Sequence, residues 1–118
     1  MNDIEQEIQA KGLTAPRITP ANIEEKIIST HYFTAAEGAI AHGNMNKDAQ
    51  IPEITPSLEL LTFCVLVLKN GFTVTGESAC ASPENFNAEI GQKIAFDNAK
   101  NKIWALEGYL LKERLSEK

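Results

Sequence analysis

The sequence predicts an α+β protein in which an antiparallel β-hairpin or small sheet packs on a long C-terminal helical segment, with short helices at the N-terminus. The pair Asn70-Gly71 separates an apolar, β-branched run from an alternating one, and this is the strongest short-range signal for a hairpin. From Phe86 to Leu110, apolar residues recur at spacings of three or four, which is typical of an amphipathic helix. Helix-capping residues precede two short segments in the first half of the chain.

Length and composition fit one globular domain spanning residues 1–118. The chain is 43% hydrophobic and 23% charged, proportions that are ordinary for a globular protein. No run approaches the roughly 18 apolar residues of a membrane span. The N-terminus MNDIEQEIQA is acidic, where a signal peptide would be basic and then apolar. We therefore expect a cytoplasmic protein with no membrane partner.

Acidic residues are concentrated in the first half of the chain. Residues 1–59 contain four Lys and Arg against nine Asp and Glu, whereas residues 60–118 contain seven of each. A protein that binds duplex nucleic acid usually presents a dense basic face to the phosphates, and no cluster of Lys or Arg here supplies one. The charge pattern disfavours duplex nucleic acid as a partner but leaves room for a pocket that binds one small anion.

Helix signals in the first half are interrupted by a loop. Residues 1–18 are expected to form a weak helix or a mobile tail. Thr34 and Glu37 have the spacing of a capping box before a short alanine-rich helix that ends near Gly43. Two prolines and no sustained period predict a surface loop at residues 44–57.

A better-defined helix is predicted to begin at Thr19. Threonine is a good N-cap, and Pro20 fits the first helical position. The stretch is TAPRITPANIEEKIIST, residues 14–30. Ile23 and Ile27 would lie on the inward side of this helix, and Tyr32 would join them if the helix continued.

A primed two-residue turn at Asn70-Gly71 sets the expected register of the hairpin. The expected pairs are Lys69 with Phe72, Val67 with Val74, Val65 with Gly76, and Cys64 with Glu77. Because side chains alternate between the two faces of a sheet, Cys64 would share a face with Glu77, and Cys80 would point to the other face. A disulfide would then need a bulge or a chain reversal, so reduced cysteines are expected.

The hairpin needs a covering partner, because two strands alone are marginally stable. Its first strand is apolar on both faces, which suits burial between helices on one side and a partner subunit on the other. We therefore expect a homo-oligomer. The alternative is that residues around Ile51 to Ile54 supply a short third strand.

Ser82 and Pro83 are expected to cap and begin the long C-terminal helix. Its apolar stripe runs through Phe86, Ile90, Ile94 or Ala95, Ala99, Ile103, Leu106 and Leu110. The segment forms one long helix or two helices with a bend. A break would fall around Trp104 and Gly108, because glycine weakens a helix.

The strand-to-helix junction, GESACASPENF at residues 76–86, is the candidate binding site. A helix N-terminus at Ser82 would offer unpaired backbone amides and the positive end of the dipole to a phosphate or carboxylate. The expected ligand-binding residues are Glu77, Ser78, Ser82, Asn85, Phe86 and, from a neighbouring helix or subunit, Arg114. Phe86 would stack on a base, and Arg114 or Lys112 would pair with an anion. In the simpler alternative, Ser82 caps its own helix and Phe86 is the first core residue.

Signals for catalysis are weak, so we expect no enzymatic activity, no cofactor and no metal. A serine nucleophile on a tight turn has glycines two residues to either side, but Ser78 is followed by Cys80 at that spacing. Cysteine catalysis needs a base to form the thiolate, and the only histidines, His31 and His42, lie in the N-terminal half. The histidines and cysteines also lack the close spacing of a zinc site.

Two stretches carry a family resemblance. Residues 61–115 contain the runs NGFTVTGESACASPENF, IGQKIAFDNA and EGYLL, and residues 30–39 read THYFTAAEGA. Together they resemble the small phage and prophage protein family named after gene product 49 of one coliphage and gene product 66 of another. This resemblance implies a phage accessory protein and carries no assigned activity.

A further similarity in layout is to the phage anti-defence sponges that sequester the cyclic ADP-ribose signal of the Thoeris system. Those proteins combine a β-hairpin with C-terminal helices and assemble as oligomers that hold a nucleotide at subunit junctions. The similarity implies an oligomeric, non-enzymatic binder of a small nucleotide-like signal in the host cytoplasm. The alternative is an interaction module that docks on a host or phage protein through its acidic N-terminal half, and an enzyme is the third hypothesis.

Overall fold

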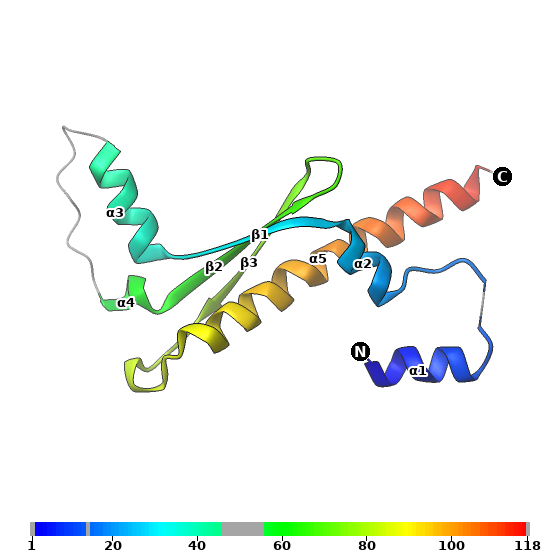
Figure 1. Ribbon diagram of the computed structural model, residues 1–118, viewed down its shortest axis with the longest axis horizontal. Coiled ribbons are helices and arrows are strands. Elements are labelled where there is room, and N and C mark those ends of the chain that lie inside the picture. The colour runs from blue at the N-terminus through cyan, green and yellow to red at the C-terminus, as the bar shows by residue number, and fades with distance from the viewer. Residues whose placement is uncertain (1, 14, 46–55, 118) are drawn as a thin grey trace.

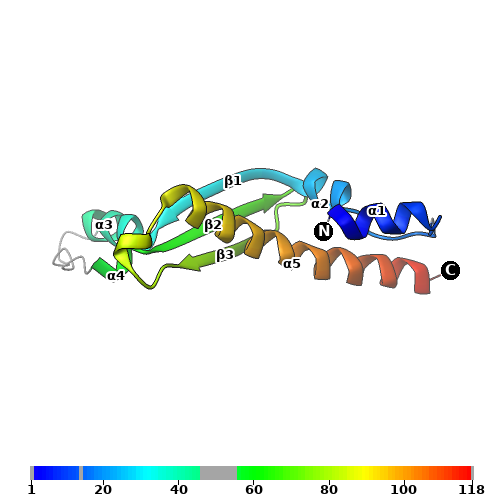
Figure 2. The same ribbon diagram turned by 90° about the horizontal axis from the view of Figure 1, so that it is seen from below.

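The computed structural model describes residues 2–13, 15–45 and 56–117, and it has an α+β fold (Figure 1). The elements are α1 (Asn2–Ala10), α2 (Pro20–Lys26), β1 (Ile27–Thr34), α3 (Ala35–Met45), α4 (Pro56–Glu59), β2 (Leu61–Leu68), β3 (Thr73–Ala79), the 3-10 turn η1 (Pro83–Asn85) and α5 (Ala88–Ser116). The three strands form one antiparallel sheet in the order β1-β2-β3. Helix α5 crosses one face of this sheet (Figure 2). The predicted fold class is confirmed.

The third strand is β1, which begins at Ile27, where the sequence predicted that the helix from Thr19 continues. Helix α2 ends at Lys26, and Ile27 already has extended backbone angles, φ −85° and ψ 120°. The prediction was wrong because β-branched Ile27, Ile28 and Thr30 favour a strand when a partner is available, and β2 provides that partner. The alternative strand at residues 51–54 lies outside the described residues.

The hairpin closes with a three-residue loop, so its register differs by one residue from the predicted one. The amide of Leu68 donates to the carbonyl oxygen of Phe72 at 2.8 Å, and Gly71 adopts a φ of 90°. This is the geometry of a turn followed by a left-handed glycine. Cys64 therefore pairs with Gly76, and Glu77 pairs with Phe63.

This one-residue difference moves Glu77 to the face opposite Cys64, so the predicted sharing of a face was wrong. Because side chains alternate along the strand, Cys80 lies on the same side of the sheet as Cys64. The prediction that the two cysteines point to opposite faces was therefore also wrong. Both cysteines are free thiols. They are separated along the strand instead: Cys80 lies four residues beyond Gly76, the partner of Cys64, or roughly 13 Å at the rise of a strand.

The core lies between α5 and the sheet. Helix α5 presents small residues there, with Gly91, Ala95 and Ala99 buried, followed by the buried Ile103. Opposite them lie the buried side chains of Cys64, Leu66, Leu68 and Val74. At Gly76, a β-carbon would collide with the carbonyl oxygen of Ala95 and the amide nitrogen of Ala99. The helix backbone therefore rests directly on β3.

The predicted caps at Thr19 and Thr34 are confirmed. Thr19 and Asn22 form a reciprocal capping box at the start of α2, with Pro20 in the first turn. Thr34 and Glu37 exchange the corresponding hydrogen bonds at 3.0 and 3.1 Å before α3. These motifs depend on residues three apart in the sequence, so they form wherever the backbone turns into a helix.

Helix α1 is joined to the segment that follows it by a bidentate ion pair. Arg17 Nη1 and Nη2 each donate to a carboxylate oxygen of Glu5 at 2.8 Å. These bonds, helped by a third from Gln9, lower the pKa of Glu5 to about 2. In the structure, the expected weak helix or mobile tail forms a helix over residues 2–10.

Candidate functional site

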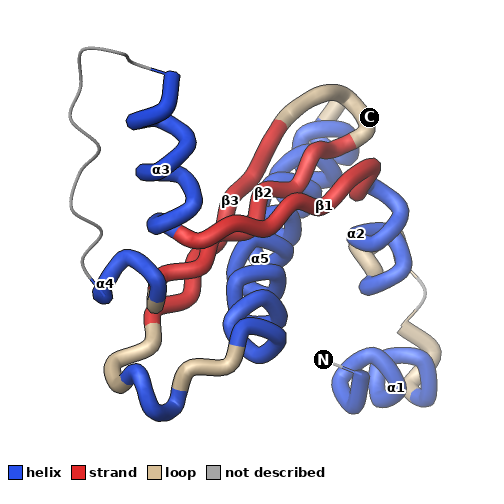
Figure 3. The backbone as a smooth tube through the Cα atoms, turned by 60° about the vertical axis from the view of Figure 1, so that its left-hand side comes forward, coloured by secondary structure: helices blue, strands red, loops and turns tan. Residues whose placement is uncertain are grey.

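Three of the six predicted binding residues meet at the β3–α5 junction. Ser78, Asn85 and Phe86 line one pocket of about 130 Å³, together with apolar Ile90 and Ile94. Ser78 comes from the end of β3, Asn85 ends η1, and Phe86 follows it. The tube in Figure 3 shows how the chain turns here between the end of β3 and the start of α5. The junction therefore brings together a hydroxyl, an amide and an aromatic ring.

The other three predicted residues do not line this pocket. Glu77 is exposed on the opposite face of the sheet, and its carbonyl oxygen accepts a hydrogen bond from Asn98 Nδ2 at 2.8 Å. The carbonyl oxygen of Ser82 accepts from the thiol of Cys80 at 3.2 Å. Arg114 lies near the other end of α5. At 1.5 Å per residue, it is roughly 36 Å from Ile90 along the helix axis.

The start of the helix is also displaced from the predicted position. The side chain of Ser82 makes no capping hydrogen bond, and η1 follows it. Helix α5 begins at Ala88 and is capped by Asn87, whose Oδ1 accepts from the amide of Ile90 at 3.0 Å. The helix then runs through Trp104 and Gly108 without a break. The positive end of its dipole therefore lies at Asn87, beside the junction pocket.

The size of the junction pocket limits what one chain can hold. Pockets that enclose small molecules usually have volumes of about 300 to 1,000 Å³, whereas this one has about 130 Å³. One chain alone can enclose a phosphate or part of a base. A whole nucleotide would need further walls, and a second chain is the simplest source of them.

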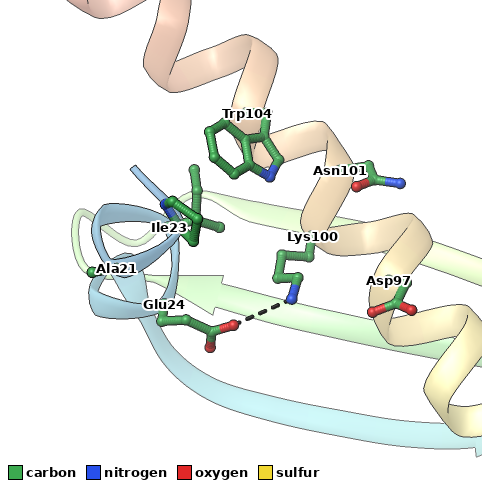
Figure 4. A pocket seen from close by; sticks show the side chains of 8 residues that line it. Ala21, Ile23, Glu24, Asp97, Lys100, Asn101 and Trp104 are labelled. Carbon is green, nitrogen blue, oxygen red and sulfur yellow. Dashed lines mark hydrogen bonds and ion pairs between the residues drawn. The ribbon is translucent and has the colours of Figure 1, made fainter. Parts of the chain in front are cut away.

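A second pocket, of about 570 Å³, lies between α2 and α5 (Figure 4). Lys100 Nζ lies 3.2 Å from Glu24 Oε1 and 5.2 Å from the centre of the Phe96 ring. Asp97 and the half-buried Trp104 complete its polar and aromatic lining. The lining holds two carboxylates, Glu24 and Asp97, but one ammonium group, so the local charge disfavours an anion.

Sequence reasoning missed this second pocket. The signal available was the spacing of Asp97, Lys100, Asn101 and Trp104, which places these four side chains on one side of a helix. Glu24, which pairs with Lys100, lies 76 residues away from it in the sequence. Only the packing of α2 on α5 brings the two sets together.

The groups considered for catalysis are kept apart. Burial raises the pKa of the Cys64 thiol, so it stays protonated at neutral pH. His31 forms a hydrogen bond with Ser29 Oγ at 3.0 Å and pairs with Val65 on β2. The amide of Cys80 donates instead to the carbonyl oxygen of Leu60, which lies five residues before Val65 in the chain. Within residues 2–13, 15–45 and 56–117, no group of three or more His, Cys, Asp or Glu could hold a metal ion.

Comparison with known proteins identifies the family of the chain. No curated protein and no solved structure matches it. In the described part of the chain, no helix is both long enough and apolar enough to cross a membrane. The model of one family, described as phage protein (N4 Gp49/phage Sf6 gene 66), matches residues 18–115. The match covers most of the chain and both stretches that carried the resemblance, so the chain belongs to this family of phage proteins.

Proposed function

We propose that this phage protein is a non-enzymatic, oligomeric binder that sequesters a small nucleotide-derived immune signal, such as a cyclic ADP-ribose isomer, in the host cytoplasm. The proposal rests on the junction pocket, where Ser78, Asn85 and Phe86 meet beside the N-terminus of α5. By holding the signal, the protein lowers its free concentration and counteracts host defence.

Each group at the junction matches one part of a nucleotide. The Phe86 ring offers a stacking surface for a base. The Asn85 amide and the Ser78 hydroxyl can donate and accept hydrogen bonds to a base edge or a ribose. The N-terminal end of α5 favours a phosphate. Arg114 lies too far along α5 to reach the junction of its own chain, so its proposed role in binding requires a second copy.

Binding without catalysis agrees with the state of the nucleophiles. The Cys64 thiol is buried and protonated, and the Cys80 thiol donates to the backbone oxygen of Ser82. A thiol becomes a strong nucleophile only as the thiolate. Among the described residues, neither cysteine thiol forms a hydrogen bond with a histidine ring.

Isothermal titration with cyclic ADP-ribose isomers and with cyclic oligonucleotides tests the proposal. We expect one of these probes to bind the wild-type protein. Phe86→Ala should weaken that binding about tenfold or more, because stacking of a base on an aromatic ring contributes about 1–3 kcal/mol.

Ile4→Ala is the control. Ile4 is 60% exposed on α1, away from both the junction and the hairpin, so its loss should leave the affinity unchanged. Absence of heat with every probe at high protein concentration would contradict the proposed function. Equal weakening by the two variants would place the ligand away from the junction.

The α2–α5 pocket favours a second function, docking on a host or phage protein. Its lining holds two carboxylates, Glu24 and Asp97, and the Trp104 ring. These groups suit an Arg or Lys side chain, which can form an ion pair and a cation–π contact. The acidic N-terminal half would extend this surface.

Capture of a partner from infected cells tests this second function. The bait should be the wild-type protein, Asp97→Lys, and Lys93→Glu as a control for altered charge on the same helix. Lys93 pairs with Glu89 on the exposed surface of α5 and does not line the pocket. A partner retained equally by wild type and Asp97→Lys would contradict docking at this pocket.

A further inference from the structure

Two apolar surfaces of the described chain remain uncovered. The first, called here the open sheet face, is the side of the sheet away from α5. It carries the partly exposed side chains of Phe63, Val65 and Val67. Phe33 lies at its edge, where its ring faces Gly38 of α3 and lies 5.5 Å from the ring of Phe63. The second, called here the overhang, is the end of α5 over residues 106–116. Figure 2 shows this end of the helix extending past the sheet.

The length of α5 explains the overhang. A helix of 29 residues is about 43 Å long, whereas an eight-residue strand such as β2 spans about 26 Å. Ile103 is the last residue of α5 that is fully buried. The three turns after it therefore project beyond the sheet.

The sheet-facing side of α5 stays apolar along the overhang. Leu106 follows Ala99 by seven residues and Ala95 by eleven, so all three lie on one side of the helix. Beyond the sheet, this side carries large side chains in place of alanine: Leu106, Tyr109 and Leu110 are 41%, 73% and 38% exposed. The overhang therefore presents an apolar side that the sheet of its own chain does not cover.

We propose that two copies of this chain cover these surfaces reciprocally, with the overhang of each copy packed on the open sheet face of the other. A two-fold axis that passes the hairpin ends, perpendicular to the strands and in the plane of the sheet, produces this arrangement. It places the second sheet in the same layer as the first, but turned over. The open face of each sheet then meets the apolar side of the other copy's overhang.

The dimensions of the two surfaces match. The overhang is about 16 Å long, and the distance from Val67 to Phe63 along β2 is about 13 Å. Each copy contributes one overhang and one open face, or about twenty residues, which is at the lower end of a standard interface of about 800 Å² per partner. Burial of both surfaces would also remove an apolar patch that a monomer rarely exposes.

Charge adds a pairing that identifies the occupant as a second copy. Asn98 faces the β3 side of α5, because it bonds the backbone of Glu77. Lys112 follows Asn98 by fourteen residues, nearly four turns, so it lies on the same flank of α5 but about 40° further from the sheet-facing side. The two-fold axis keeps that flank over the β3 of the second copy, where Glu77 is exposed on the open face. Neither Lys112 nor Glu77 has an ion pair with another described residue.

Sedimentation velocity of the full chain tests the arrangement without any ligand. The wild-type protein should be a dimer at about 100 μM, well above the dissociation constant that an interface of this size supports. Leu110→Asp should abolish the dimer and leave the far-UV circular dichroism unchanged, because Leu110 lies outside the monomer core. A monomeric wild-type protein, or a dimer that survives Leu110→Asp, would overturn the proposal.

A charge swap then distinguishes this arrangement from one in which two overhangs pair with each other. Lys112→Glu and Glu77→Lys should each raise the dissociation constant about tenfold, since like charges then meet across the interface. The double variant should return to within about threefold of wild type. Lys93→Glu is the control and should have no effect. If Lys112→Glu acts and Glu77→Lys neither weakens the dimer nor rescues it, the overhang does not lie on the sheet, and the proposal fails.

Discussion

Replacing Gly76 by alanine is expected to destabilise the fold by about 3 kcal/mol, the upper end of the usual cost of overpacking a core. The added methyl group would collide with the Ala95 carbonyl oxygen and the Ala99 amide nitrogen. Both are backbone atoms of α5, so they cannot turn aside as a flexible side chain would. Relief would require α5 to move away from β3, which would open the packing around Leu66 and Val74. Urea unfolding followed by circular dichroism measures the loss.

Gly108→Ala is the matched control, because it makes the same chemical change on α5 where nothing lies within 4 Å of the new methyl group. Alanine favours a helix over glycine by about 0.5–1 kcal/mol, so this variant should be more stable than wild type. Both unfolding experiments should use one protein concentration, since self-association adds to apparent stability. If Gly76→Ala unfolds at the same urea concentration as wild type, the close contact between α5 and β3 is wrong.

Features encoded by neighbouring residues could be predicted from the sequence. The capping boxes at Thr19 and Thr34, the hairpin around Gly71 and the long C-terminal helix all follow from spacings of a few residues. The hairpin register was missed because Asn70-Gly71 suits a two-residue turn and also a three-residue loop with glycine at the left-handed position. The choice between the two depends on which face of β3 packs on α5, and that is a tertiary contact.

The strand β1 was missed for a related reason. The N-terminal signals at Thr19 and Pro20 were correct, but nothing local marks the end of α2. The segment from Ile27 becomes a strand because β2, more than thirty residues later in the chain, supplies its hydrogen-bond partners. Pairings over such distances depend on the whole fold and leave little trace in local sequence.

The candidate sites show the same difference between residues that are close in sequence and residues that only the fold brings together. Ser78, Asn85 and Phe86 are close in sequence, and the junction does bring them together. Glu77 was placed on the wrong face because its side depends on the register. The α2–α5 pocket joins Glu24 to Lys100, and no pattern within either segment indicates the other. Short-range chemistry could therefore be predicted, whereas sites formed by distant segments could not.

The second large effect is expected from Ile103→Ala, which should lower the free energy of unfolding by about 3 kcal/mol. Ile103 is fully buried and belongs to the same core cluster as Ile23 of α2 and Leu68 of β2. Its removal leaves a cavity where α2, α5 and the sheet meet. The loss should appear in urea unfolding, and amide exchange of α2 should accelerate more than that of β3 because α2 has fewer other contacts with the core.

Ile90→Ala provides the comparison within the same helix and the same residue type. Ile90 is 56% exposed, so most of its side chain gains little from folding, and the expected loss is below about 1 kcal/mol. A loss from Ile90→Ala as large as that from Ile103→Ala would mean that Ile90, which lines the junction pocket, is covered in solution. A small loss from Ile103→Ala would mean that α2 does not dock on α5, and the pocket between them would then lack one of its walls.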